Sequence, residues 1–381
     1  MKVLHVGKFY PPVSGGMERM LQLLCEGERE KADSRVLVAH TASSRTAHES
    51  LNGVPITRVG SFGRVGAVQV CPSFPLWLAR AQKDVIVIHE PNPIALASYF
   101  LVRPRAPLLV WFHSEVVRPK WRYNLFYRPF LRFALKRASR IIVSSPSLAN
   151  QAAALREFLG KCVVIPFGLD AARLEPAPDT APEAEAIRQR YPGPLVLFVG
   201  RMVDYKGVDV LLRALVGVEA TTLFVGDGPR RAALEELAAD LGLGGRAVFL
   251  GDVDDRRMSA LYQACDLFVL PSVTRAEAFG LVQLEAMAAG KPVVSTAVPT
   301  GVPWVNQHGR TGLVVRPGEV PPLREAIVRL LTDPELRSRM GREGRARVST
   351  DFTIARMVAQ TTALYAQVLD GSIAALDEAR V

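Results

Sequence analysis

The sequence has little of what marks disulfide-bonded, zinc-binding or membrane-spanning proteins. Only four of its 381 residues are cysteines, and no two form a Cys-x-x-Cys pair, which argues against a disulfide framework or a structural zinc site. No apolar run approaches the roughly 20 residues of a membrane helix, and the opening run at residues 3–6 is too short for a signal peptide. We therefore expect a soluble protein of a reducing compartment, the cytoplasm.

Acidic residues are scarce in the first half of the chain. The net charge is +10, and residues 1–190 hold 26 Lys and Arg against 15 Asp and Glu, whereas residues 191–381 hold 21 against 22. The stretch 103–140 has ten basic residues and one acid, Glu115. The first half is therefore expected to meet an anionic substrate or surface.

Short, uniformly apolar runs recur along both halves and predict a parallel sheet buried on both faces in each. Each half opens with such a run ending at a glycine, at residues 3–7 and 195–200. Helical patterns separate the runs, and a length of 381 residues suits two domains of about 150–200 residues. The chain is predicted to be α/β, with two Rossmann-like, doubly wound domains. The other runs are 36–39, 85–88, 108–112, 141–143, 163–165, 222–225, 247–250, 267–270 and 293–295.

Domain boundaries follow from this alternation. One domain is expected at residues 1–180 and a second at 191–350, with a terminal helical segment at 351–381. The stretch 171–194 holds five prolines and is expected to link the domains. The terminal helix, predicted over 351–369, either completes the second domain or crosses back to brace the first.

Residues 271–285 carry the strongest local signal. A strand is expected to end near residue 271 and a helix to begin around Phe279 or Gly280. The backbone amides of Gly280, Leu281 and Val282 then lie at a helix N-terminus, which is a favourable place for phosphate.

Two carboxylates flank those amides. Glu277 and Glu285 are eight residues apart, about 12 Å on a helical path, which exceeds the roughly 5–9.5 Å of a glycosidase pair. The spacing suits a ligand with hydroxyl groups at both ends and phosphates between them, as in a nucleotide sugar. The alternative is an acid near a helix N-terminus and an exposed helical glutamate, which are both ordinary on electrostatic grounds.

Two loops after the opening strands offer phosphate contacts. Arg201 and Lys206 supply charged donors five residues apart, and the absence of Gly-Lys-Ser/Thr excludes a P-loop. Gly15 and Gly16 let the backbone approach a ligand closely, next to a helix start. The ordinary alternatives are a solvated loop for the cations and a plain strand-to-helix turn for the glycines.

Three further features have weaker claims. His89 and His113 each follow a predicted strand, and a lone histidine there is more often structural than catalytic. No His-Glu-x-x-His pattern accompanies them, so no metal site is predicted. Residues 226–231 begin like a dinucleotide fingerprint, but Arg231 takes the third glycine position, so a turn leading into a helix is predicted instead.

Residues 118–133 interleave cations with six aromatic side chains. They fit a membrane-surface element, a single-stranded nucleic-acid site, or an amphipathic helix whose core explains about half of the aromatics. The membrane surface is favoured over nucleic acid, because nothing else in the chain resembles a nucleic-acid module.

Together these motifs resemble glycosyltransferase family 4, the retaining nucleotide-sugar enzymes of GT-B fold. The resemblance runs along nearly the whole chain, through residues 11–18, 164–170, 200–207 and 225–229, and its most specific element is the E-x(7)-E signature from Glu277 to Glu285. It implies an N-terminal acceptor domain and a C-terminal donor domain facing across a cleft, with no metal and no cofactor.

The resemblance also implies roles for individual residues. Arg201 and Lys206 neutralise the donor diphosphate, Glu285 holds the ribose hydroxyls, and Glu277 contacts the transferred sugar. Further implied contacts are amides of Phe279, Gly280, Leu281 and Val282 to sugar and phosphate, Gly15 and Gly16 to the diphosphate, His113 near the anomeric carbon, and the backbone near Val253 to the base. Glu277, His113, Arg201 and Lys206 form the implied catalytic set.

The implied reaction is hexosyl transfer with retention, in which the two cations stabilise the departing nucleoside diphosphate while an oxocarbenium-like centre develops. No residue stands out as a double-displacement nucleophile. Residues 299–306 depart from the commonest family pattern and resemble a subgroup of bacterial mannosyl- and rhamnosyltransferases that build O-antigen or exopolysaccharide. GDP-mannose is the preferred donor, and a UDP-sugar is the runner-up.

The basic first half suits a polyprenyl-diphosphate-linked saccharide acceptor at an anionic membrane. We therefore expect peripheral association with the inner face of the plasma membrane and no nucleic-acid partner. Three other classes of protein stay open. A UDP-sugar 2-epimerase would leave the basic aromatic stretch without a role. An inactive scaffold would be free to lose Glu277, Glu285, Arg201 and Lys206, all of which are present, and a nucleic-acid-binding protein is supported by charge alone.

Overall fold

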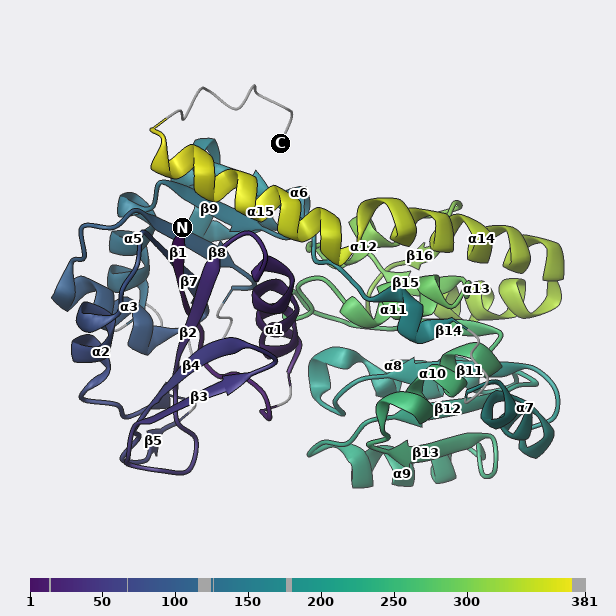
Figure 1. The fold of residues 1–381 in the computed structure, drawn as a ribbon. Coiled ribbons are helices and arrows are strands. Elements are labelled where there is room, and N and C mark those ends of the chain that lie inside the picture. Colours follow the sequence, from purple (N-terminus) through teal and green to yellow (C-terminus); the bar gives the residue numbers. More distant parts are fainter. Residues whose placement is uncertain (14, 67, 116–124, 126, 176–179, 372–381) are drawn as a thin grey trace. The chain divides into compact units, whose positions relative to one another are not determined.

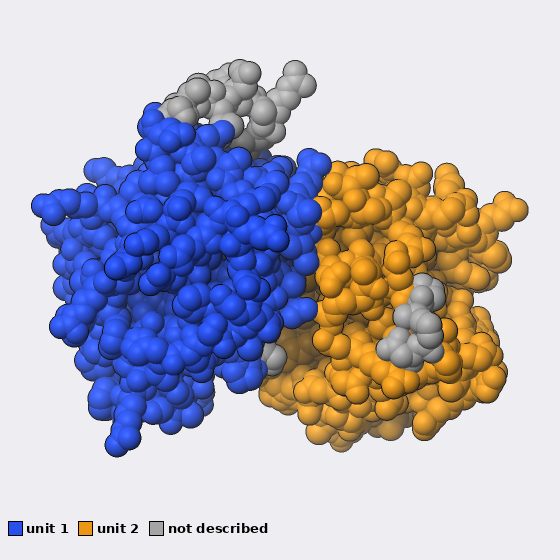
Figure 2. Space-filling view, in the orientation of Figure 1, with its two compact units in different colours: residues 1–168, 354–381 blue, residues 169–353 orange. Residues whose placement is uncertain are grey.

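A computed structural model describes residues 1–371 of the chain except 14, 67, 116–124, 126 and 176–179. The chain divides into two compact units (Figure 2). Unit 1 consists of Met1–Gly168 together with Ile354–Val381, and unit 2 is the continuous segment Leu169–Thr353. Unit 2 is therefore an insertion in the chain that forms unit 1.

Unit 1 is built on an eight-stranded sheet of order β10-β9-β8-β7-β1-β2-β4-β3 (Figure 1). All neighbouring strands are parallel except β3 and β4. The order reverses between β1 and β7, since chain order runs outward from β7 to β10 on one side and from β1 through β2 to β4 on the other, where β3 adds at the edge. The strands are β1 (Lys2–Val6), β2 (Asp33–Ala39), β3 (Ala47–Leu51), β4 (Val54–Val59), β7 (Val85–Glu90), β8 (Leu108–Phe112), β9 (Arg140–Val143) and β10 (Cys162–Val164), with a separate hairpin of β5 (Arg64–Val65) and β6 (Val68–Gln69).

Helices cover this sheet and close its core. A hydrophobic cluster joins the strands to α2, α3, α5 and α6, and a smaller cluster lies between α1 and β2 and β4. Helix α15 packs against α1, and a side chain at Gly27 would stand 2.6 Å from Val358, so the two helices approach closely there. The helices are α1 (Gly16–Glu28), α2 (Phe74–Arg80), α3 (Pro93–Val102), α5 (Arg128–Arg137), α6 (Pro146–Gln151) and α15 (Ile354–Leu369), with a 3₁₀ segment, η2 (Ala153–Lys161).

Unit 2 has a six-stranded parallel sheet of order β13-β12-β11-β14-β15-β16. This is the strand order of a Rossmann fold, with the reversal between β11 and β14. The strands are β11 (Leu195–Val199), β12 (Thr221–Val225), β13 (Ala247–Gly251), β14 (Leu267–Leu270), β15 (Val293–Thr296) and β16 (Gly312–Val315). The helices are α7 (Ala181–Arg190), α8 (Val208–Leu215), α9 (Arg231–Asp240), α10 (Asp255–Ala264), α11 (Leu281–Ala288), α12 (Val302–Val305), α13 (Val320–Thr332) and α14 (Pro334–Asp351), with short 3₁₀ turns η3 (Ala171–Leu174) and η4 (Asp204–Lys206).

The predicted α/β class and buried parallel sheets are confirmed. Every residue of β7, β8, β11 and β14 is buried, because helices cover both faces of a parallel sheet, and the only polar side chains in these four strands are His89 and Glu90 at the end of β7. Strand boundaries match the apolar runs closely, and β8 and β14 match them residue for residue.

One expectation about connecting segments is wrong. The proline-rich stretch expected as a linker contains η3 and α7, and α7 packs on α10, with Arg188 donating two hydrogen bonds to Asp266, at 2.8 and 2.9 Å. Pro182 lies in the first turn of α7, where proline is compatible with a helix, so the number of prolines misled the prediction. The helix expected over residues 351–369 is confirmed as α15, although it begins three residues later, at Ile354, because α14 runs to Asp351.

Candidate active site

The second unit places two predicted loops at its sheet reversal. β11 and β14 are neighbours, and ligands of such sheets bind beyond the carboxyl ends of the strands at this point. The loop after β11 carries Arg201 and Lys206, and the loop after β14 carries Glu277. The backbone amide of Val273 donates to the carbonyl of Tyr205 at 2.8 Å, so the two loops are joined.

Glycines allow these loops to approach one another. Gly207 has φ +66°, and a side chain there would collide with the carbonyl of Pro271. Gly226 has φ +114°, and a side chain there would collide with the carbonyl of Gly200. The predicted turn at residues 226–231 is confirmed, because α9 begins at Arg231, and its glycines serve backbone packing.

Lys206 and Glu277 form a buried ion pair with a 2.6 Å separation between Nζ and Oε2. The hydroxyl of Ser272 also donates to Glu277, at 3.2 Å. Each of the two charged residues is 8% exposed, and each offsets the cost of burying the other. Sequence reasoning selected both residues but gave no sign of the pair or of Ser272.

Helix α11 supplies the helix N-terminus predicted around Phe279 or Gly280. Gly280 caps it in the left-handed conformation, with φ +73°, and Leu281 and Val282 form its first turn. Their amides have no intrahelical partner, as at any helix start. The helix begins at Leu281, close to the predicted start, so Glu277 precedes it and the figure of about 12 Å for a helical path does not apply to the whole interval from Glu277 to Glu285.

Glu285 on α11 accepts a hydrogen bond from the hydroxyl of Tyr262, at 2.7 Å. Burial, and then the Glu285 carboxylate, raise the pKa of Tyr262 well above its usual value, so the phenol keeps its proton and stays a donor. Tyr262 lies on α10, and no local sequence pattern marks it as a partner of Glu285.

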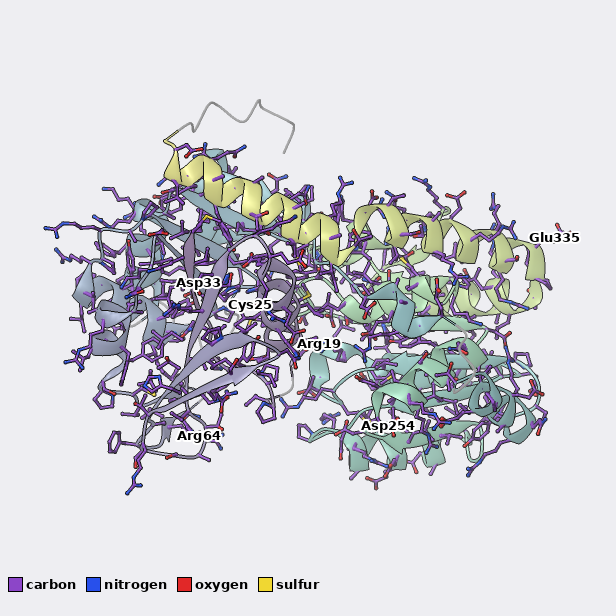
Figure 3. All side chains as sticks on the ribbon, viewed as in Figure 1. Arg19, Cys25, Asp33, Arg64, Asp254 and Glu335 are labelled. Atoms are coloured by element: carbon purple, nitrogen blue, oxygen red, sulfur yellow. The ribbon has the colours of Figure 1, made fainter. Side chains whose placement is uncertain are left out.

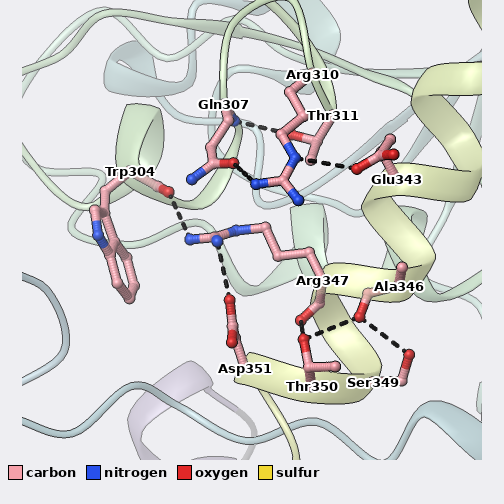
Figure 4. A network of polar contacts seen from close by, with 10 residues as sticks. All are labelled: Trp304, Gln307, Arg310, Thr311, Glu343, Ala346, Arg347, Ser349, Thr350 and Asp351. Carbon is pink, nitrogen blue, oxygen red and sulfur yellow. Dashed lines mark hydrogen bonds and ion pairs between the residues drawn. The ribbon is translucent and has the colours of Figure 1, made fainter.

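Phe279 packs against residues of the segment 299–306, which departs from the commonest family pattern, and against the end of α14. Its ring lies 6.3 Å from that of Trp304 on α12 and 6.1 Å from that of Phe352. Arg347 of α14 donates to the carbonyl of Trp304 at 3.2 Å and to Asp351 at 2.9 Å (Figure 4). The amide of Gly301 donates to the carbonyl of Ala278 at 2.8 Å, so this segment fixes the backbone around Phe279.

Val253, the residue expected to read the base, lies in the loop between β13 and α10. The next residue, Asp254 (Figure 3), caps α10 by accepting from the amide of Arg257 at 2.8 Å. Asp252 and Asp254 form an Asp-x-Asp sequence, but the second carboxylate is engaged in this cap. Within the part of the chain that the structure describes, no cluster of three or more metal-ligating side chains occurs.

In unit 1, Gly15 and Gly16 begin α1, as predicted. A side chain at Gly15 would collide with the carboxylate of Glu18 in the first turn. Glu18 is buried, and burial raises its pKa. A larger residue at position 15 would therefore displace the carboxylate of Glu18.

His113 is not a lone histidine. Its Nε2 lies 3.0 Å from Nδ1 of His89, whose Nε2 lies 3.1 Å from Nδ1 of His5. Nε2 of His5 lies 3.0 Å from Oε2 of Glu28. Glu28 also accepts from the hydroxyls of Ser34, at 2.7 Å, and Tyr365, at 2.9 Å. Sequence reasoning treated His89 and His113 separately and gave His5 and Glu28 no role.

Glu90 follows His89 in the sequence and is the last residue of β7. Its side chain is completely buried. The hydroxyl of Tyr127 and the amide of Asn92 donate to the same oxygen, Oε2. Burial raises the pKa of Glu90 to about 7, against the lowering effect of these hydrogen bonds.

The basic aromatic stretch is described only in part, and residues 118–124 and 126 lie outside the described residues. Tyr127 belongs to the core cluster, and Phe130 and Phe133 of α5 pack against it. These three aromatics are therefore helix-core residues, as the amphipathic alternative predicted. The cations Arg128, Arg132 and Lys136 are exposed.

The two Rossmann-like sheets are those of the GT-B fold, which is the class of structure to which this protein belongs. HepE of Anabaena, solved in complex with UDP, matches with a TM-score of 0.78 and 22% identity, covering 96% of this chain and 100% of that one. No helix among the described residues is sufficiently long and apolar to cross a bilayer.

The chain belongs to the group 1, family 4 glycosyltransferases. The family model "Glycosyl transferase 4-like domain" matches residues 15–168, and "Glycosyl transferases group 1" matches residues 182–347. The D-rhamnosyltransferase WbpZ of Pseudomonas aeruginosa is 34% identical over 361 residues, 93% of this chain and 92% of WbpZ. O-antigen chain mannosyltransferase C of Escherichia coli is 29% identical over 379 residues, 97% of this chain and 99% of that protein.

Proposed function

We propose that this glycosyltransferase moves a manno-configured hexose, with retention, from a nucleoside-diphosphate sugar onto a saccharide acceptor of bacterial surface polysaccharide synthesis. GDP-mannose is the proposed donor. The observation that carries the proposal is the buried Lys206–Glu277 pair beside the amino end of α11, with Glu285 further along the same helix. This places cationic, amide and carboxylate groups together, as a sugar–diphosphate–ribose ligand requires.

Each group suits one part of such a donor. Lys206 has ammonium hydrogens left after pairing with Glu277, and Arg201 is exposed beside it in the loop, so both can reach a diphosphate. The Leu281 and Val282 amides add neutral donors, next to Phe279 and Gly280. Glu285, oriented by Tyr262, accepts ribose hydroxyls, and the backbone at Val253 contacts the base.

The chemistry assigned to these residues is stabilisation of the leaving group. Arg201 and Lys206 offset the charge that grows on the diphosphate as the glycosidic bond breaks. Glu277 contacts the sugar hydroxyls while holding Lys206 in place. In unit 1, Gly15 and Gly16 support the diphosphate, and His113 contacts the sugar. The remaining donor contacts belong to unit 2, and unit 1 takes the acceptor.

The names of the relatives support a manno-configured sugar. D-rhamnose is 6-deoxy-D-mannose, so the sugars in the names of WbpZ and mannosyltransferase C differ only by the hydroxyl at C6. An epimerase is not proposed, because both of these relatives are named as transferases.

Thermal unfolding with GDP, UDP, dTDP and ADP tests the donor site. A nucleotide present at 100 times its Kd stabilises by about 2.7 kcal/mol. GDP is expected to raise the Tm of the wild type and of the exposed control variant Glu236→Ala, and not of Glu285→Ala. A rise with UDP alone would replace the proposed base, and no rise with any nucleotide would contradict the donor site.

Product analysis then tests the reaction itself. With GDP-mannose and a lipid-linked or soluble saccharide acceptor, we expect release of GDP and an α-configured product, because an α-linked donor sugar retains its configuration. A β-linked product would contradict retention. Preference for the 6-deoxy donor would change the sugar and leave the class of reaction intact.

We further propose that the acceptor is a polyprenyl-diphosphate-linked saccharide reached at an anionic membrane surface. Arg128, Arg132 and Lys136 follow one another at four-residue spacing on α5, so they lie along one exposed face. Arg132 is paired with Glu157 at 2.7 Å, which leaves Arg128 and Lys136 as the principal charges of this face.

Flotation with phosphatidylglycerol vesicles at low salt tests this surface. The wild type and the control Arg329→Ala/Arg339→Ala, which removes two exposed arginines of unit 2, are expected to float. Arg128→Ala/Lys136→Ala is expected to lose about tenfold in bound fraction, since each basic group contributes about 1 kcal/mol near such a surface. Equal flotation of all three proteins would overturn the assignment of α5.

A further inference from the structure

A buried chain of hydrogen bonds in unit 1 links His113 to the carboxylate of Glu28. The four members are His113, His89, His5 and Glu28, joined by separations of 3.0, 3.1 and 3.0 Å. The three histidines are 4%, 3% and 0% exposed, and Glu28 is 0% exposed. We name this set the histidine relay.

The partners of Glu28 set the direction of the relay. Ser34 and Tyr365 both donate their hydroxyl hydrogens to this carboxyl group, so it offers lone pairs to His5. Nε2 of His5 must then carry hydrogen and donate. We take each ring of the relay to carry a single N–H, in which case Nδ1 of His5 is an acceptor.

The same reasoning passes from ring to ring. His89 donates from Nε2 to His5, and its Nδ1 accepts from Nε2 of His113. The opposite arrangement, with hydrogen on every Nδ1, leaves His5 unable to donate and therefore requires an extra proton on Glu28. Burial lowers the pKa of His113 to about 3, and burial together with the neighbouring histidines lowers the pKa of His89, so these two rings are neutral.

The free end of the relay is Nδ1 of His113. This atom is buried, and among the described residues it has no hydrogen-bond partner. His113 directly follows β8, at the sheet edge where ligands of α/β folds bind. The rings of Trp111 and Phe167 stack on it, at 5.8 and 5.5 Å between centroids, and hold its plane.

We propose that Glu28, His5 and His89 are positioning residues that fix His113 as the Nε2–H tautomer, so that Nδ1 is presented as a hydrogen-bond acceptor for a hydroxyl group of the donor sugar. The identity of that hydroxyl-bearing ligand rests on the proposed function, whereas the tautomer does not. A fixed acceptor favours a ligand hydroxyl over a ligand carbonyl or phosphate oxygen, because two acceptors cannot share a hydrogen bond.

Nitrogen NMR of ligand-free protein labelled with ¹⁵N-histidine tests the tautomer. The chain has six histidines, and single His→Gln variants assign their signals. We expect a protonated Nε2 and a bare Nδ1 for His5, His89 and His113 at pH 7.5. A protonated Nδ1 on His113 would overturn the proposal. The tautomer is measured on the wild-type protein, and the variants serve only to assign its signals.

Glu28→Gln tests the source of the direction, with Glu26→Gln on the same helix as the matched control. Glutamine offers hydrogen as well as lone pairs, so the variant is expected to lose the single tautomer of His113 while the control keeps it. By analogy with other groups that orient an imidazole, kcat with GDP-mannose falls about tenfold to a hundredfold and KM stays within about twofold. An unchanged His113 spectrum in Glu28→Gln would overturn the role of Glu28. Failure of GDP-mannose to bind would count against the proposed donor alone.

Discussion

At the scale of single residues, sequence reasoning found side chains but not their partners. Arg201, Lys206 and Glu277 stand out because they follow strand ends, which is a local property. Tyr262 and the histidine relay do not, because their contacts join distant parts of the chain: Tyr365 and Glu28 are 337 residues apart. A sequence pattern reports the neighbours along the chain, whereas burial and hydrogen bonding depend on neighbours in space.

Glu90 gives a prediction for pH. Its folded pKa of about 7 exceeds its usual value of 4.5, so the folded state binds a proton more tightly than the unfolded state. The contribution is stabilising below pH 4.5 and is lost as the pH rises through 7. Replacing Glu90 by glutamine removes it. Lowering the pH from 7.5 to 5.5 should therefore favour the wild type over Glu90→Gln by about 2 kcal/mol in free energy of unfolding.

Urea unfolding at both pH values measures this difference. Glu325→Gln, an exposed change on α13, is the control and should follow the wild type at both values. His113 acts in the opposite sense, because its folded pKa of about 3 is depressed and its stabilising effect is lost as the pH falls below about 6.5. The comparison therefore uses the difference in free energy of unfolding between Glu90→Gln and the wild type at each pH, because His113 is present in both proteins. A difference independent of pH would contradict the assigned burial effect on Glu90.

At the scale of elements, strands with a continuous apolar run were predictable, including the edge strands β10 and β13, whereas β3, β4 and β16 were missed. β3 is an edge strand whose residues are exposed or half-buried, so it shows no apolar run. β16 lies at the edge of the other sheet and begins with Gly312, at which a side chain would collide with the carbonyl of Val293. Its four residues, a glycine among them, were too weak a pattern to be recognised as a strand.

Helix α14 gives a prediction for packing, because two of its glycines face the α11 region. A side chain at Gly341 would collide with the carbonyl of Gly290, and one at Gly344 would stand 3.1 Å from Cγ of Met287. We expect Gly341→Ala to destabilise unit 2 by about 1–3 kcal/mol and Gly344→Ala by less, since a backbone carbonyl yields less than a methionine.

Urea unfolding ranks these variants against Gly160→Ala, whose side chain meets nothing within 4 Å. Because α11 carries Glu285, Gly341→Ala should also reduce the thermal stabilisation by the bound nucleotide. Equal stability of Gly341→Ala and Gly160→Ala would contradict the close contact between α14 and the Gly290 turn.

At the scale of the whole molecule, the predicted pair of Rossmann-like sheets is confirmed, and each unit has its own core cluster. We expect calorimetry to resolve two unfolding transitions. A saturating nucleotide should raise chiefly that of unit 2, by about 5–10 °C, because most of the proposed diphosphate and ribose contacts, from Arg201, Lys206 and Glu285, lie there.

Tyr365→Phe is the complementary change. It removes the hydroxyl that donates to Glu28, and we expect it to lower only the transition of unit 1, by the few degrees that correspond to about 1.5–3 kcal/mol. A single transition that responds to both the nucleotide and the variant would show that the units unfold together.

The division of the chain also sets an order of assembly on the ribosome. Unit 2 is encoded without interruption, so all of it can fold once Thr353 has emerged. Unit 1 is encoded first, yet its α1 lacks the packing of α15, and Glu28 has the hydroxyl of Ser34 but not that of Tyr365, until α15 is made. The nascent protein can therefore complete the continuous unit 2 before unit 1, and α15, which is translated after all of unit 2, finishes the unit that was begun first.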